Sequence, residues 1–270
     1  MQLLNGPGIL AEKIFIESVF LKRRVEIDFF LPKNVPDPTQ LNLLVINDGQ
    51  NLAEMGFQSV LENLYAGETI APLLCAGIYA GKERKMEYGV ASQPDYLGRG
   101  VNAGLYTTFI LEELLPFIYK NYSITSFKEK AVAGFSLGGL MALDILWNHP
   151  DQFTKCGSFS GSFWWRSVDQ DDPSYDDNKH RIMQQVISKG QYYKGLKFFF
   201  QCGNKDETMD RNKNGIIDSI DDTMAVIDEL VAKGYSRQND ICYMEMPEGK
   251  HDVPTWAEAM PEFLRWGWGK

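Results

Sequence analysis

Lys130-Ala131-Val132-Ala133-Gly134-Phe135-Ser136-Leu137-Gly138-Gly139 is the stretch that decides how this chain folds. Its first four residues form a short, mostly apolar run that suits a buried strand. The pattern Gly-x-Ser-x-Gly follows, and the next residues, 140–147, are rich in helix formers. Strand, tight turn and helix in this order are typical of a nucleophile elbow, which projects the serine hydroxyl out of a sheet. The alternative is a glycine-rich turn that packs a helix on a strand and leaves the serine idle.

Apolar runs and helical patterns alternate along the rest of the chain. Residues 14–31 indicate two antiparallel strands, and continuous apolar runs typical of strands covered on both faces lie at 43–46, 73–79, 156–160, 196–202 and 241–246. Helical patterns separate them at 106–119, 179–189, 222–233 and from residue 256 onward. The alternation predicts a doubly wound, mostly parallel sheet with an antiparallel N-terminal hairpin. Without repeats or linkers, residues 1–270 are expected to form a single domain.

Composition and charge exclude several classes of partner. The formal net charge of -9 at pH 7 argues against nucleic acid and against an anionic membrane surface. No apolar run approaches the ~20 residues of a membrane span. Residues 1–8 lack the charged and apolar segments of a secretory signal, so we expect a cytoplasmic protein, or a periplasmic one if a leader was removed. The four widely separated cysteines indicate free thiols. The sequence leaves the oligomeric state open.

A serine hydroxyl needs a base, usually a histidine that a carboxylate holds in the right tautomer. The chain has three histidines: His149 ends the helix after the elbow, His180 starts a charged helix, and His251 follows the last predicted strand. A loop after that strand lies on the carboxyl edge of the sheet, where folds of this kind place their sites. His251 is therefore the predicted base.

The orienting acid is expected after the preceding strand, because the chain order in this kind of site is serine, acid, histidine. The strand at 196–202 leads into Gly203-Asn204-Lys205-Asp206-Glu207. Asp206 is the preferred candidate and Glu207 the second, since the sequence cannot distinguish two adjacent carboxylates. The alternative is a solvated charged loop. Asp252 is too close in sequence to His251 to reach its ring productively.

An oxyanion hole needs two backbone N–H donors. One is expected from Leu137, the residue after the nucleophile. The other is expected from the loop after the 43–46 strand, where Gly49 or Gln50 could turn an amide toward the site.

These residues resemble the putative-esterase family of α/β-hydrolases, which includes enterochelin esterases, esterase D, feruloyl esterases and mycolyltransferases. The resemblance covers nearly the whole chain and rests on residues 46–51, 84–88, 109–122, 134–139, 158–163 and 249–256. It implies an α/β-hydrolase fold and a serine ester hydrolase that needs no cofactor for its chemistry. The implied roles are nucleophile for Ser136, base for His251 and orienting acid for Asp206, with an oxyanion hole near Gly49, Gln50 and Leu137.

The expected partner is a small-molecule ester, of a small, carbohydrate or siderophore type. Trp164 and Trp165 could stack on a sugar or aryl group, although core packing is the commoner role of such residues. Arg84 could bind a carboxylate or phosphate, and a surface pair with Glu87 is the alternative. Two other functions stay open: acyl transfer to an alcohol, as in the mycolyltransferases, and a catalytically silent ligand-binding protein.

Residues 210–221 follow a twelve-residue calcium-loop pattern. Oxygen ligands fall at positions 1, 3, 5, 7, 9 and 12, with glycine at position 6 for the turn. The candidate ligands are Asp210, Asn212, Asn214, Ile216 through its carbonyl, Asp218 and Asp221. The hypothesis is a structural calcium ion that braces the loop beside the predicted acid. The alternative is an Asn-Gly turn in which the last two aspartates begin a helix.

Overall fold

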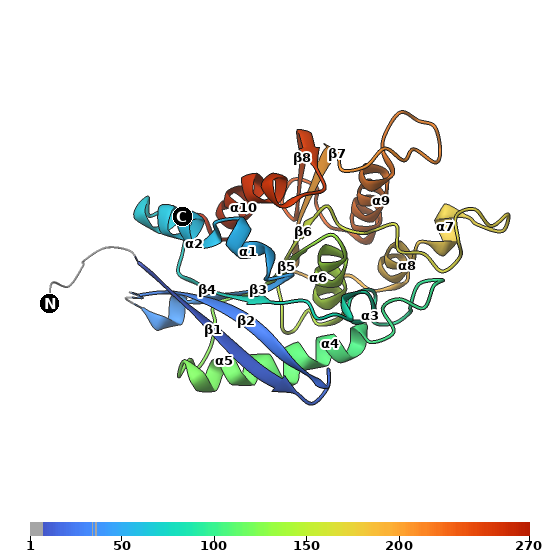
Figure 1. The fold of residues 1–270 in the computed structure, drawn as a ribbon. Helices are drawn as coiled ribbons and strands as arrows, with labels where there is room; N and C mark the ends of the chain where they lie inside the picture. The colour runs from blue at the N-terminus through green and yellow to red at the C-terminus, as the bar shows by residue number, and fades with distance from the viewer. Residues whose placement is uncertain (1–7, 34, 36) are drawn as a thin grey trace, which may run out of the picture.

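The computed structural model describes residues 8–33, 35 and 37–270. The expectation about a secretory signal depends on residues 1–8, and of these only Gly8 is among the described residues. One eight-stranded sheet in the order β1-β2-β4-β3-β5-β6-β7-β8 runs through the described chain (Figure 1). The strands are β1 (Ile9–Ser18), β2 (Arg23–Pro32), β3 (Asn42–Asn47), β4 (Leu73–Ile78), β5 (Lys130–Phe135), β6 (Lys155–Phe159), β7 (Lys197–Lys205) and β8 (Ile241–Lys250).

The direction of the strands matches the prediction. β1 and β2 form an antiparallel hairpin, and β2 joins β4 antiparallel. From β4 through β3 and β5 to β8, each neighbouring pair is parallel. The mostly parallel sheet with an antiparallel N-terminal hairpin is therefore confirmed. Because parallel strands end at the same edge, the loops after β3, β5, β7 and β8 come together there.

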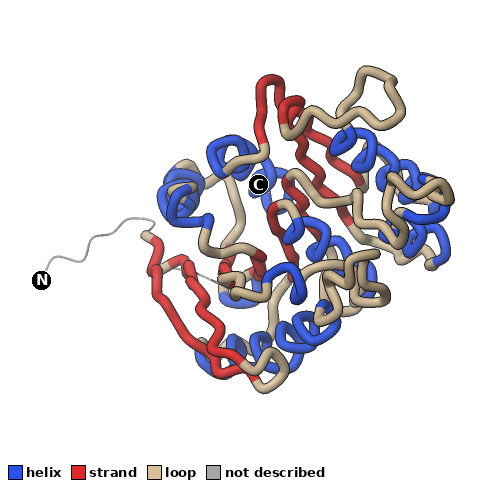
Figure 2. Tube along the Cα trace, turned by 45° about the vertical axis from the view of Figure 1, so that its right-hand side comes forward, coloured by secondary structure: helices blue, strands red, loops and turns tan. Residues whose placement is uncertain are grey.

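Helices cover both faces of the sheet (Figures 1 and 2). One face packs against α4 (Ala103–Phe109), α5 (Leu115–Asn121), α6 (Leu137–Asn148), α8 (Ile182–Lys189) and α9 (Asp218–Lys233). The other packs against α1 (Asn51–Glu54), α2 (Phe57–Ala66) and α10 (Val253–Trp268). Successive strand residues alternate between these two apolar clusters, as Val45 and Ile46 do. This double burial explains why the strands read as continuous apolar runs.

Several elements differ from the expectation in detail. The helix predicted at 106–119 is α4 and α5 joined by a π-helical segment at Ile110–Leu114, and a further short helix, α3 (Arg84–Glu87), lies outside the predicted helical segments. The helix predicted at 179–189 is split into α7 (Asp177–His180) and α8, and residues 38–40 form a 3-10 turn. All four cysteines are free thiols, as predicted. Within the described ranges, no helix has the length and apolar character needed to cross a membrane.

Candidate active site

Ser136 lies between β5 and α6, in the turn that the sequence predicts. Its backbone has φ 56° and ψ -120°, a conformation that costs a non-glycine residue ~1–3 kcal/mol. The flanking glycines make this turn possible. A Cβ on Gly134 would lie 2.3 Å from the carbonyl oxygen of Gly138, and one on Gly138 would lie 2.5 Å from Asp48 Oδ2. The glycines of the pattern are therefore a steric requirement of the turn.

The Ser136 hydroxyl is half-buried at the carboxyl end of the sheet. Its Oγ lies 3.4 Å from Ser162 Oγ. The main chain around it is fixed, because the Ser136 N–H donates to the Phe159 carbonyl at 2.9 Å and the Ser162 N–H donates to the Ser136 carbonyl at 3.1 Å. The described contacts include no direct hydrogen bond between this hydroxyl and His251. Catalytic hydrogen bonds of this kind are commonly long before substrate binds.

The strands β7 and β8 bring Asp206 and His251 together. Beyond a bulge at residues 203–205, the two strands pair as far as Lys205 and Lys250, so the next residues leave the sheet side by side. Both side chains line a pocket of about 110 Å³. Gly203 makes room for the acid, since a Cβ there would lie 2.8 Å from Asp206 Oδ1.

The two groups act on each other through charge. Burial lowers the pKa of His251, and the negative charge of Asp206 opposes this shift. Burial raises the pKa of Asp206, and the Ser160 hydroxyl and the His251 charge oppose that shift. A histidine with a lowered pKa is neutral, and able to accept a proton, at ordinary pH.

Of the neighbouring carboxylates, Asp206 stays the predicted orienting acid. Glu207 lines the same pocket, and burial raises its pKa, but the negative charges acting on the imidazole are those of Asp206 and Asp252. Asp252 caps α10 instead, because its Oδ1 accepts the Thr255 N–H at 3.0 Å and the Thr255 hydroxyl at 2.8 Å.

Gly49 and Gln50, the two residues expected to donate from the oxyanion loop, differ in whether the backbone N–H is already hydrogen-bonded. Gly49 is wrong as a donor, because its N–H already donates to the Ile78 carbonyl at 2.7 Å. A Cβ at this position would lie 2.3 Å from the Gly77 backbone, so the glycine serves to pack the loop on β4. The backbone N–H groups of Gln50 and Leu137 have no acceptor among the described hydrogen bonds. These two remain the predicted donors.

The sequence interpretation missed Asp48. This buried residue has φ 63°, and its carboxylate receives Arg84 Nε and Nη2, both at 2.7 Å. Arg84, expected as a substrate ligand or as the partner of Glu87, therefore binds within the protein. Glu87 instead pairs with Arg23, at 2.8 and 2.7 Å. The only available signal was an aspartate directly before a glycine in the predicted loop.

The two tryptophans that we expected to contact substrate, Trp164 and Trp165, lie in different environments. Trp165 is wrong as a substrate contact because it is fully buried: a Cβ on Gly89 or on Gly100 would lie 2.7 or 2.8 Å from its indole. Trp164 is half-buried and lines the pocket shared with His251. The Arg99 guanidinium lies 4.9 Å from its ring centroid.

The predicted calcium ligands hydrogen bond to one another or to other protein groups. Asp221 Oδ2 accepts the side-chain amides of Asn212 and Asn214, and the carboxylate of Asp210 accepts the backbone N–H groups of Asn214 and Gly215. In the described parts of the chain, no three histidine, cysteine, aspartate or glutamate side chains group as metal ligands. In this arrangement these groups are engaged within the protein, and the calcium hypothesis stays a prediction.

Arg211 braces this loop from within the protein. Its backbone N–H donates to Asp218 Oδ1 at 2.9 Å, and its guanidinium lies 3.2 Å from the same carboxylate. The guanidinium also reaches Asp222 at 2.6 Å and Asp177 at 3.1 Å. Asp218 is the first residue of α9, so one buried cation ties the loop after β7 to two helices.

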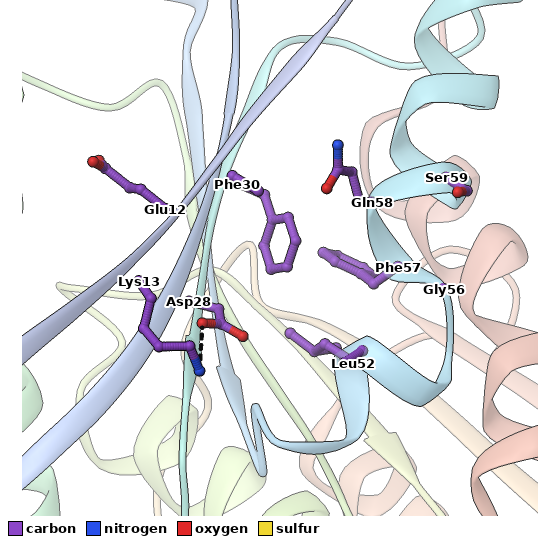
Figure 3. A pocket seen from close by; sticks show the side chains of 11 residues that line it. Glu12, Lys13, Asp28, Phe30, Leu52, Gly56, Phe57, Gln58 and Ser59 are labelled. Carbon is purple, nitrogen blue, oxygen red and sulfur yellow. Dashed lines mark ion pairs between the residues drawn. The ribbon is translucent and has the colours of Figure 1, made fainter.

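A second pocket, of about 360 Å³, lies between the β1–β2 hairpin and helices α1 and α2 (Figure 3). Phe30, Leu52 and Phe57 form its apolar side, and Lys13 pairs with Asp28 at 3.2 Å at its rim. None of its lining residues belongs to the predicted catalytic set. Leu52, which follows the oxyanion loop, fills the space beside Gly77, where a Cβ would lie 2.5 Å from its side chain.

Comparison with known proteins gives one family and a consistent fold. The sequence matches the family described as Putative esterase over residues 18–266. The uncharacterized protein YbbA of Bacillus subtilis (strain 168) is 28% identical over 131 residues, which cover 46% of this chain and 50% of that protein. This alignment thus spans half the length of that relative.

Two solved structures share the fold. An enterochelin esterase from Shigella flexneri superposes with a TM-score of 0.68 and 24% identity, over 96% of this chain and 58% of that one. A ferulic acid esterase superposes with a TM-score of 0.69 and 19% identity, over 97% of this chain and 98% of that one. The architecture is the α/β-hydrolase fold, as predicted.

Proposed function

The chain belongs to the putative esterase family, and we propose that it is a serine carboxylic-ester hydrolase that works through an acyl-enzyme. The observation that carries the proposal is the conformation of Ser136, whose strained backbone is permitted only by glycines that could not bear a Cβ. Strain of this kind persists where the surrounding structure imposes it, and it clusters at functional sites.

The proposed reaction uses the residues at the carboxyl edge of the sheet. Ser136 Oγ attacks the ester carbonyl carbon while His251 takes its proton. The oxyanion that forms accepts the N–H groups of Gln50 and Leu137. The ester oxygen then leaves with the proton from His251. Water attacks the acyl-serine by the same route in reverse and frees the acid, while Asp206 orients the imidazole in both steps.

The substrate we propose is a small-molecule ester with an aromatic or sugar-like group near the bond that is cut. Trp164 supports this, because it lines the pocket of His251 and offers an aromatic surface on which such a group could stack. The solved neighbours named for enterochelin and ferulic acid esters point to the same class.

Replacing the nucleophile tests the reaction. We expect Ser136→Ala to lower kcat on p-nitrophenyl acetate by at least ~10³-fold, because no other nucleophile can form the acyl-enzyme. A fluorophosphonate probe should label wild type at Ser136 and leave the variant unlabelled. Ser162→Ala is the matched control, since its hydroxyl lies 3.4 Å from Ser136 Oγ, and labelling should persist there. Full activity in Ser136→Ala would disprove the mechanism.

Two further readouts separate the alternative functions. Acyl transfer uses the same three residues, so only products formed with an added sugar or alcohol distinguish it from hydrolysis. A silent binding protein would leave Ser136 unlabelled by the probe.

A further inference from the structure

The loop after β3 is held so that one backbone donor stays free. The Asp48 N–H donates to the Tyr88 hydroxyl at 3.3 Å, the Gly49 N–H to Ile78, and the Asn51 N–H to the Asp48 carbonyl at 3.0 Å. Gln50 alone in this run has a backbone N–H with no described acceptor. Its side chain is tied on both sides, because Nε2 donates to Asp48 Oδ1 at 3.1 Å and Oε1 accepts the Ala80 N–H at 3.0 Å.

The same loop is joined directly to the nucleophile elbow. Asn47 Nδ2 donates to the Gly138 carbonyl at 2.9 Å, and Asp48 Oδ2 lies 2.5 Å from where a Cβ of Gly138 would be. Arg84 bridges the two segments: its Nε and Nη2 bind Asp48, and Nη2 also donates to the Phe135 carbonyl at 3.3 Å. Phe135 is the residue before the nucleophile, so one guanidinium contacts both sides of the expected oxyanion hole.

We propose that Asp48 and Arg84 form a positioning pair, which clamps the loop bearing the Gln50 amide onto the nucleophile elbow. The inference rests on the proposed esterase function and adds two residues that do not touch the reacting atoms. A buried carboxylate needs a paired, hydrogen-bonded cation, and the planar guanidinium can bind both of its oxygens at once. Lysine offers a single charged point and cannot reproduce that fork.

Arg84 has a second measurable effect, because its positive charge is among the groups that lower the pKa of His251. Removing the charge should raise that pKa, so the acidic limb of the kcat/KM profile should move to higher pH. A merely structural residue would not shift this limb. Arg84→Lys keeps the charge and should keep the limb near its wild-type position while kcat falls.

A second ion pair, between Glu87 on the same short helix and Arg23 on β2, provides a matched control. Arg23 and Glu87 form an equally bidentate ion pair of similar burial, with Glu87 in α3 beside Arg84 but bonded toward the hairpin. Glu87→Gln therefore breaks a comparable ion pair without touching the elbow. Gln50→Ala is a second probe that should fold normally, because that side chain is exposed.

The experiment measures kcat, KM, the pH profile and thermal stability of each purified variant, after probe labelling has established that wild type is active. We expect Asp48→Asn and Arg84→Met to lower kcat ~10²-fold with KM nearly unchanged, the effect of losing one oxyanion donor. Gln50→Ala should lower kcat ~10-fold, and Glu87→Gln should stay within ~3-fold of wild type.

The outcomes distinguish this proposal from the function on which it rests. Wild type that neither reacts with the probe nor hydrolyses esters would overturn the proposed function. An active wild type in which Asp48→Asn and Arg84→Met lose no more kcat than Glu87→Gln, with the acidic limb unmoved in Arg84→Met, would overturn the positioning pair alone. If Asp48→Asn fails to fold, Gln50→Ala and Arg84→Lys decide, and wild-type kcat in both would also overturn it.

Discussion

The two sides of the candidate site are built differently. On the nucleophile side, Ser136, Asp48 and Arg84 are fixed by sterically required glycines and short hydrogen bonds. On the acid–base side, the buried carboxylate oxygens of Asp206 lack a close hydrogen-bond partner among the described residues, and no described hydrogen bond fixes the His251 ring. The contrast is what we expect of a site in which the proposed nucleophile and oxyanion loop are preorganised. We infer that the acid–base hydrogen bonds tighten when substrate covers His251.

The largest effect is expected from breaking the rigid side. In Gly134→Ala the new methyl group would lie 2.3 Å from the Gly138 carbonyl oxygen and 2.9 Å from Asn47 Cβ. Overpacking of this kind costs ~1–3 kcal/mol of stability, and the turn that aims the nucleophile must open. We expect esterase activity to fall at least ~10³-fold, together with a lower melting temperature.

Gly267→Ala is the matched control for this change. Gly267 lies in helix α10, and a Cβ there meets no atom within 4 Å. Alanine should therefore stabilise the helix by ~0.5–1 kcal/mol and leave activity intact. Equal losses in both variants would show that the elbow is no more constrained than an ordinary helical glycine.

The next largest effect is expected on the side of the site that holds Asp206 and His251. We expect Asp206→Asn to lower kcat/KM ~10²-fold, less than in a fully hydrogen-bonded triad, because no direct bond joins it to His251 in this state. Since the Asp206 charge opposes the lowering of the His251 pKa, its removal should lower that pKa further. The acidic limb should then move to lower pH, opposite to the shift expected for Arg84→Met.

Glu207→Gln is the companion variant. Glu207 lies one residue farther along, and its charge is not among those that shift the pKa of His251, so we expect kcat/KM within ~3-fold of wild type and an unmoved acidic limb. A larger loss in Glu207→Gln than in Asp206→Asn would reassign the orienting acid.

The same contrast explains how much the sequence could predict. The elbow is local: spacing of glycines around Ser136, with a strand before and a helix after, is enough to place the nucleophile. The mostly parallel sheet follows from the alternation of apolar runs and helical patterns, and the choice of His251 as the predicted base follows from its position after the last strand. The choice of Asp206 over Glu207 depends on where β7 and β8 stop pairing, which no local pattern contains.

Contacts between distant segments account for the errors. Asp48 and Arg84 are 36 residues apart, and the ion pair that joins them is visible only once the β3 loop folds over the elbow. The sequence could not distinguish Gly49 from Gln50 as an oxyanion donor, because the hydrogen bond from the Gly49 N–H to Ile78 on the neighbouring strand exists only in the folded protein. Trp164 and Trp165 are adjacent in sequence, but Trp165 is fully buried against Gly89 and Gly100, whereas Trp164 stays half-buried beside Arg99.

The smallest effect on activity is expected from the loop at residues 210–221. Arg211→Met removes a cation that contacts Asp177, Asp218 and Asp222, so we expect a lower melting temperature and a loss of activity of only ~3–10-fold through a looser Asp206. Adding calcium or a chelator to wild type tests the calcium hypothesis: both should stay unchanged if the loop is braced only by Arg211 and by the asparagine amides that donate to Asp221. A calcium-dependent rise in melting temperature that Asp221→Asn abolishes would restore the ion as the brace of this loop. The side of the site that holds Asp206 and His251 would then depend on a bound ion, whereas the side that holds Ser136 would not.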